Sequence, residues 1–127
     1  MIEKLRAEIT TNSSGDATVY LTPGVNSRPN GLLLVLIYTP GSIVTGADLT
    51  ITGESSGIPI LTITNAGTTL KHWYPRALLN AVADGTAASA GSEVIPICNE
   101  RIQVVVAQGG DTKTGTIEAL LLTDSPY

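Results

Sequence analysis

Few side chains in this sequence are of the types that carry out chemistry. His72 is the single histidine and Cys98 the single cysteine in a chain of 127 residues. A Ser-His-Asp or Cys-His site would have to use His72, and no companion motif surrounds it. One histidine and one cysteine cannot complete a tetrahedral zinc site, and the carboxylates are scattered singly rather than clustered as calcium requires. We therefore predict a protein that is not an enzyme, with no metal and no cofactor.

One glycine-rich stretch is superficially similar to a phosphate-binding loop. Gly109 and Gly110 precede Lys113. The spacing of a P-loop, which is Gly, four residues and then Gly-Lys-Ser/Thr, is absent, and a strand rather than a helix is predicted to follow. The pattern favours a glycine turn between two strands over an anion site.

The two single residues have structural interpretations. We expect His72 to pack beside Trp73 at a strand end or an interface, because a lone histidine without a companion signature is weak evidence for a site. Cys98 follows Pro96 and Ile97. In that apolar context a free cysteine is expected to behave as a small core hydrophobe.

The charge and the hydropathy of the whole chain exclude several classes of partner. The net charge is −4 and the sequence pI is near 4.7, so no general electrostatic attraction to nucleic acid or to an anionic membrane is expected. No run of 18 apolar residues is present, and residues 1–6 lack the order of a secretory signal. We expect a single domain over residues 1–127, synthesised in the cytoplasm, with no membrane partner.

Two apolar runs near the C-terminus organise the predicted fold. Residues 102–107 and 116–123 have strand composition, and the turn formers of residues 108–115 join them, so we predict a β-hairpin. In the second run Ile117, Ala119 and Leu121 share one face, while the other face is also mostly apolar. A strand that is apolar on both faces needs cover from a second sheet or from another subunit.

Two-residue alternation predicts strands along the rest of the chain. Residues 4–10 alternate as a half-buried strand, with a helix as the alternative, and residues 17–21 are expected to pair with them as a hairpin. Residues 32–38 read as a central strand buried on both faces. Further strands are predicted at 47–52, 59–64 and 93–97. The fold class is all-β, a β-sandwich with the jelly roll as one form, of about seven to nine short antiparallel strands.

Residues 80–92 are the most unusual segment. They are nearly all Ala, Gly, Ser and Thr, which predicts a long loop with too few apolar anchors to order itself without a partner. Tryptophan, tyrosine and arginine, the residue types enriched in binding hot spots, stand just before it. The predicted interface residues are Trp73, Tyr74, Arg76, Ala83, Asp84 and Gly85. The alternative for Trp73 is that it fills one end of an aromatic-poor core.

Several segments together resemble a family of small proteins encoded among the structural genes of tailed bacteriophages. They are Gly15-Asp-Ala-Thr-Val-Tyr20, Gly31-Leu-Leu-Leu-Val-Leu-Ile37, Ala47-Asp-Leu-Thr-Ile-Thr-Gly53, Gly57-Ile-Pro-Ile-Leu61 and Glu100-Arg-Ile-Gln-Val-Val-Val-Ala-Gln-Gly-Gly-Asp-Thr-Lys-Thr-Gly-Thr116. The most specific part is the string that starts at Ala107, because a strand-turn-strand unit would accept many other loops.

This resemblance implies a capsid cement or decoration protein on the virion surface. Its expected partners are other copies in a homo-oligomer, most simply a homotrimer, and the major capsid protein, whose neighbouring capsomers it would stabilise. One alternative is a phage tail or fibre-base component. A second alternative, from a different class, is a carbohydrate-binding β-sandwich in which Trp73 and Tyr74 stack on sugar faces.

Overall fold

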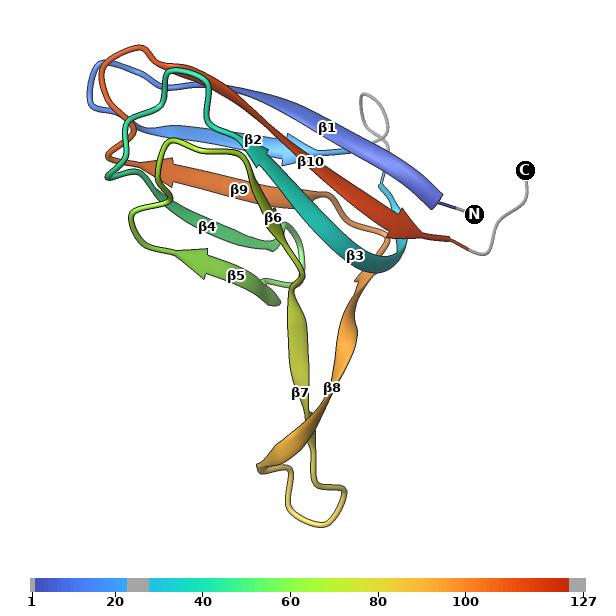
Figure 1. Ribbon diagram of the computed structural model, residues 1–127. Coiled ribbons are helices and arrows are strands. Elements are labelled where there is room, and N and C mark those ends of the chain that lie inside the picture. The colour runs from blue at the N-terminus through green and yellow to red at the C-terminus, as the bar shows by residue number, and fades with distance from the viewer. Residues whose placement is uncertain (1, 23–27, 124–127) are drawn as a thin grey trace.

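A computed structural model describes residues 2–22 and 28–123, with the side chains of residues 88–90 left aside. Its described part is built of ten strands in two antiparallel sheets, so the predicted all-β fold and β-sandwich are confirmed (Figure 1). The first sheet contains β1 (Ile2–Thr10), β10 (Thr114–Leu122), β3 (Asn30–Thr39), β6 (Lys71–Trp73), β8 (Ala87–Cys98) and β7 (Arg76–Asn80). The second contains β2 (Ala17–Leu21), β9 (Ile102–Ala107), β4 (Asp48–Gly53) and β5 (Pro59–Ile63).

The strand order is that of a jelly roll. One sheet runs β1-β10-β3-β8-β7, with β6 also paired to β3, and the facing sheet runs β2-β9-β4-β5. The position beside β3 is shared, because β6 covers one part of that edge and the inner part of β8 covers the other. With this shared position counted once, and with β7 left out because it pairs only with the outer part of β8, eight positions form two facing sheets, which is the jelly-roll arrangement.

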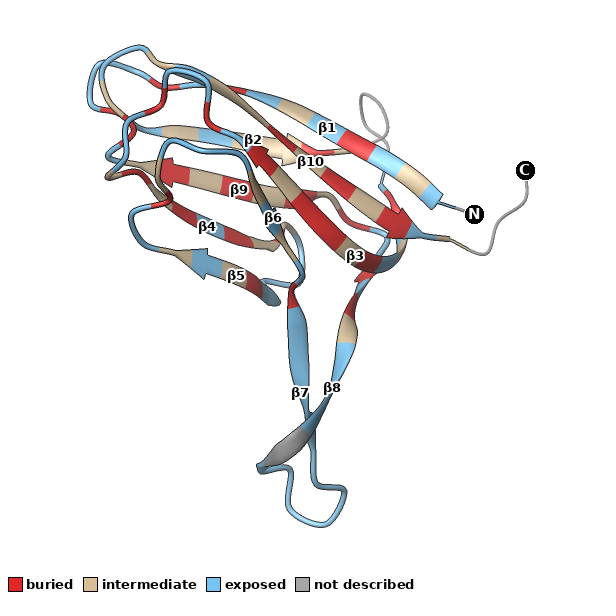
Figure 2. Ribbon diagram, viewed as in Figure 1, coloured by how far each residue is buried: buried red, intermediate tan, exposed pale blue. Residues whose placement is uncertain are grey.

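Alternating side chains build the core between the sheets. Ile102, Val104 and Val106 of β9 are buried, and so are Ile117, Ala119 and Leu121 of β10 (Figure 2). Because successive side chains of a strand point to opposite faces, each sheet contributes every second residue to this core. The strand prediction for residues 4–10 is confirmed and the helix alternative is wrong, since these residues pair in register with β10.

Both predicted sequential hairpins are wrong. β9 and β10 belong to different sheets, and so do β1 and β2. Residues 108–115 therefore carry the chain from one sheet to the other. This crossing is held by Thr11, whose hydroxyl donates to the carbonyl of Gly110 over 2.6 Å and accepts from the amide of Lys113 over 2.7 Å. The connection from β9 to β10 is therefore held by a side chain about a hundred residues earlier in the sequence.

The outer face of the β1-β10-β3 sheet is not covered in the single chain. β3 alternates between buried and half-buried positions instead of being buried on both faces as predicted. Leu122 is paired with Ile2 on one side and Leu32 on the other, and all three are exposed. The predicted second apolar face of the last strand therefore exists, and part of it lies open.

The predicted loop at residues 80–92 is also wrong. Asn80 ends β7, residues 81–86 form a turn, and β8 begins at Ala87. The two strands form a hairpin that projects away from both sheets, below the sandwich in Figure 1. The strands pair from Arg76 with Val94 to Leu78 with Ser92 and again at Asn80 with Ala87, with a shift of register between these two parts.

Candidate protein interface

The projecting hairpin, residues 76–94, is called the arm from here on. All five residues of β7 are exposed. Leu78 is 56% exposed, Leu79 is 49% exposed, and Val82 in the turn is 105% exposed. An isolated two-stranded hairpin is marginally stable in water, and exposed apolar side chains that cluster on one element mark an interaction surface. The arm therefore has the composition and the shape of a docking element.

The arm leaves the sandwich at an irregularity in β3. β3 pairs with β8 as far as Leu33 and with β6 from Leu36. Between these pairs Leu34 is an extra residue relative to β10, which makes a β-bulge. Arg76, the first residue of β7, donates from Nη1 to the Leu34 carbonyl over 3.2 Å. A bulge bends a strand and interrupts its ladder, so this is where the edge strand can divide into β6 and β8.

Trp73 fixes the base of the arm. Its ring stacks on Tyr38 with centroids 5.5 Å apart and planes inclined by 15°. Pro75, two residues later, is buried. Tyr38 is fully buried and its hydroxyl has no hydrogen-bond partner among the described residues, and this burial raises the pKa of the phenol. The stack holds the last residue of β6 against the core, so the arm starts from a rigid point.

The tip of the arm is ordered by its own polar groups. Oδ1 of Asp84 accepts from the amide of Thr86 over 3.1 Å and from its hydroxyl over 2.9 Å. These two bonds hold the pKa of Asp84 below its ordinary value. Asn80 Nδ2 donates to the Gly85 carbonyl over 2.9 Å, and Gly85 adopts a φ of 75°, which glycine tolerates best. The turn at residues 81–86 thus has internal polar bonds that the sequence did not predict.

The six predicted interface residues lie at two ends of one element. Trp73, Tyr74 and Arg76 are at the base of the arm, while Ala83, Asp84 and Gly85 are at its tip. Trp73 serves the core, as the alternative interpretation held, whereas Tyr74 is 65% exposed beside it. Prediction from sequence missed Leu78, Leu79 and Val82. The sequence did contain a signal for them, because they are large apolar side chains next to a segment of small residues. The prediction of a loop led us to overlook it.

A second feature that the sequence did not reveal is a buried carboxylate. Glu100, between β8 and β9, is 2% exposed. Its Oε1 accepts from the amides of Ser55 and Ser56, each over 2.9 Å, and its Oε2 accepts from the Ser56 hydroxyl over 2.8 Å. Burial alone raises the pKa of Glu100, but the bonds from the two serines outweigh it and leave this pKa below its ordinary value. We call this arrangement the Glu100 clamp.

A salt-bridge network lies beside the Glu100 clamp. Arg101 forms a two-pronged ion pair with Glu54, and the Arg101 side chain holds the pKa of Glu54 below its ordinary value. The guanidinium of Arg101 also lies 4.0 Å from the ring centroid of Tyr20 on β2. The Glu100 clamp and the Glu54–Arg101 ion pair thus both join the β4-β5 turn to the residues that precede β9.

The two residues considered first for chemistry lie apart from such clusters. His72 is exposed on β6 and pairs in register with Ile37. Cys98 is exposed at the end of β8, so the prediction that it packs in the core is wrong. Its neighbour Pro96 is exposed as well, because the alternation of β8 directs Ile95 and Ile97 inward. Within residues 2–22 and 28–123, no group of three or more His, Cys, Asp or Glu side chains could hold a metal ion.

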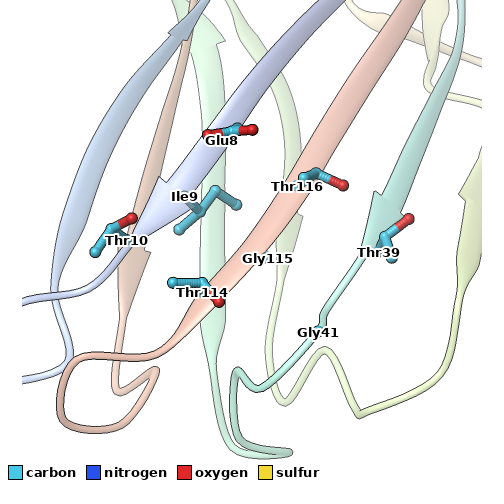
Figure 3. Close-up of a pocket in the computed structure, with 8 residues that line it drawn as sticks. All are labelled: Glu8, Ile9, Thr10, Thr39, Gly41, Thr114, Gly115 and Thr116. Atoms are coloured by element: carbon cyan, nitrogen blue, oxygen red, sulfur yellow. The ribbon is translucent and has the colours of Figure 1, made fainter.

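Two surface pockets lie at opposite ends of the β1-β10-β3 sheet. The first, with a volume of about 360 Å³, is lined by Glu8, Ile9, Gly41, Gly115 and four threonines, Thr10, Thr39, Thr114 and Thr116 (Figure 3). The second, of about 500 Å³, is lined by Leu32, Ile97, Leu122, Cys98, Asn30, Gly31 and Thr123. The first offers hydroxyl groups and one carboxylate, and the second offers mainly apolar side chains.

None of the described residues forms a helix long and apolar enough to cross a membrane. No family model matches the chain, and no curated protein matches it. A solved structure titled "Crystal Structure of FLHE" is similar, with a TM-score of 0.48, 12% sequence identity, and coverage of 96% of this chain and 98% of that chain. So distant a likeness says nothing about what this chain binds.

The function expected from sequence is not supported by the comparisons. The match reported is to FLHE and not to a capsid, tail or sugar-binding protein, so the expected role as capsid cement and its two alternatives are set aside. The wider resemblance to small tailed-phage proteins stays a prediction that no match tests. What can be argued about function therefore comes from the geometry of the arm and of the sandwich.

Proposed function

We propose that this chain is a non-catalytic assembly protein that binds a protein partner through the arm. The observation that carries the proposal is that β7 is exposed along its whole length and, with the turn, presents Leu78, Leu79 and Val82. Binding would bury the exposed part of these side chains and would contribute about 1.5–3 kcal/mol for Val82 and about half as much for Leu78 and Leu79, which are already half covered. The sandwich acts as the rigid support.

The construction of the base supports a docking role over a merely tolerated insertion. Trp73 is stacked on Tyr38, and Arg76 is bonded to the Leu34 carbonyl, so the direction of the arm is fixed before any partner arrives. Fixing a binding element in advance lowers the conformational entropy lost on association. The buried or half-buried carboxylates Glu100 and Glu54 support the non-catalytic part of the proposal, because their oxygens are engaged by serines and by Arg101.

Site-specific photocrosslinking in the native cell tests this proposal. A benzophenone amino acid is placed at Val82 in the tip of the arm and, as a matched control, at Thr62, an exposed residue of β5 on the body. We expect a discrete adduct from position 82 and none from position 62, with the attached protein identified by mass spectrometry. Absence of an adduct at position 82, or equal adducts from both positions, would refute the arm as the docking element.

A further inference from the structure

The charges of β1 follow an order that is complementary to itself. β1 is the terminal strand of its sheet, and within the described residues it pairs only with β10. Leu5 and Ile9 point into the core, so Lys4, Arg6 and Glu8 share the outer face of the strand. Two positive charges are thus followed, at the same spacing, by a negative one. An antiparallel copy of the strand presents the reverse order, so that charges of opposite sign can meet.

The free edge of β1 has a regular backbone. Its ladder with β10 runs from Ile2 to Thr10 without a shift of register. An edge strand of this kind presents unpaired amide and carbonyl groups to a further strand. Charged side chains usually keep such edges apart, because like charges directly opposite one another are destabilising. On β1 this protection acts against a parallel copy, in which each residue meets its own counterpart, but it fails against an antiparallel one.

We propose that β1 pairs antiparallel with β1 of a second copy of the chain, about a two-fold axis at Ala7. In this register Arg6 lies opposite the partner's Glu8, and Glu8 lies opposite the partner's Arg6. Lys4 is diagonal to the partner's Glu8, a separation that long side chains can span. An axis at Arg6 would instead place the two Arg6 side chains opposite each other, and repulsion between like charges disfavours that register.

Apolar side chains on the same side of the sandwich favour a partner there. β2, the terminal strand of the facing sheet, lies against β1. On this side Ala7, Ala17 and Val19 pack on the core and are only half-buried. A second copy joined at Ala7 approaches this side, and the apolar surface that it covers there contributes to association. Charge therefore sets the register, and partly covered core residues add to the affinity.

The size of the contact indicates a weak dimer. β1 contributes nine residues, whereas a standard stable interface takes roughly 20–30 residues a side. We therefore expect a Kd in the micromolar range and a dimer that exchanges with its monomer. This inference does not depend on the docking role of the arm. It gives a dimer, in place of the homotrimer expected from the sequence resemblance.

Charge reversal on β1, measured by sedimentation, tests the pairing. Arg6→Glu and Glu8→Arg should each raise the dimer Kd about tenfold, because two pairs of opposite charge become pairs of like charge. An equimolar mixture of the two variants should dimerise again, since every directly opposite pair is then of opposite sign. Lys71→Glu on β6 makes the same change in net charge as Arg6→Glu but lies outside β1, so it should leave the Kd unchanged. Circular dichroism verifies that each variant is folded.

Cysteine crosslinking tests the register separately. In a Cys98→Ser background, a mixture of Arg6→Cys and Glu8→Cys should form a disulfide-linked dimer under a mild oxidant faster than either variant alone, because only the mixture places two thiols directly opposite. Equal rates for the mixture and the single variants would overturn the register. A monomeric unmodified chain at about 100 µM, or an unchanged Kd in both charge variants, would overturn the pairing of β1 altogether.

Discussion

Removing the Glu100 carboxylate should destabilise the fold far more than removing an exposed carboxylate. Glu100→Ala deletes the acceptor of three hydrogen bonds, two from the backbone amides of Ser55 and Ser56 and one from a hydroxyl. A hydrogen bond to a charged group contributes about 1.5–3 kcal/mol net. Both serines are exposed, so water can replace part of this loss. We expect a decrease of about 2–4 kcal/mol in the free energy of unfolding.

Denaturant unfolding at pH 7, followed by Trp73 fluorescence and circular dichroism, measures this loss. Glu8→Ala is the matched control, because Glu8 is exposed and its nearest cation, on Arg6, is 3.8 Å away. The control should unfold at the same denaturant concentration as the unmodified chain. Glu100→Gln should lie between the two, since its amide oxygen can still accept from the two backbone amides. An equal effect of Glu100→Ala and Glu8→Ala would refute the clamp as a stabilising element.

The pH dependence of stability gives a second test of the Glu100 clamp. The pKa of Glu100 is lower in the folded chain than in the unfolded one, because the two serines bond to the charged form. The stabilisation is therefore complete above the unfolded carboxyl pKa and is lost as the pH falls through the folded value. The difference in stability between the unmodified chain and Glu100→Gln should shrink between about pH 5 and pH 3. A difference that grows on acidification would contradict this assignment.

Three further predictions concern the base of the arm and the turns. Trp73→Ala should lower stability by about 2–3 kcal/mol and speed proteolysis within the arm, because the stack on Tyr38 is lost; unchanged cleavage of the arm would contradict its role at the base. Tyr38→Phe should be neutral or stabilising by up to about 1 kcal/mol in thermal unfolding, since the buried hydroxyl that it removes has no partner among the described residues; a clear loss would reveal an overlooked bond. Gly41→Ala should lower stability more than Gly57→Ala. Both positions have positive φ, but only at Gly41 would the new methyl group clash with the Thr114 carbonyl oxygen, and equal losses in denaturant unfolding would refute that packing argument.

Local pattern was sufficient to predict most strands of the sandwich, although β6 was missed. The valines and isoleucine of residues 102–107 alternate between buried and half-buried positions, as period-two side chains must in a sheet with one covered face. Residues 4–10 alternate in the same way, and they form a strand rather than a helix because they pair along their whole length with β10. Whether a segment is a strand or a helix depends mainly on side chains that are close in sequence, so it can be predicted from the sequence alone.

The pairing of those strands was not predictable in the same way. A short glycine-rich segment such as residues 108–115 can close a hairpin or cross between sheets, and its own residues favour neither. The crossing between sheets is held by bonds from Thr11 to Gly110 and Lys113. These bonds can form only when the first and last strands lie side by side. The sequential hairpins were inferred from proximity in the chain, whereas the jelly roll pairs β1 with β10 and β9 with β2 and β4.

The interface was located only in part for a similar reason. Hot-spot residue types drew attention to Trp73 and Arg76, but composition alone predicted a loop where the chain forms a hairpin. Ala, Ser and Gly have too little strand preference to show that they pair with β7. Glu100 gave no local signal, because its partners Ser55 and Ser56 lie more than forty residues away in sequence. The sequence alone determined most of the extended segments of the sandwich but not β6 or the arm, and the tertiary structure decided which segments meet, because pairing is settled by contacts between distant residues.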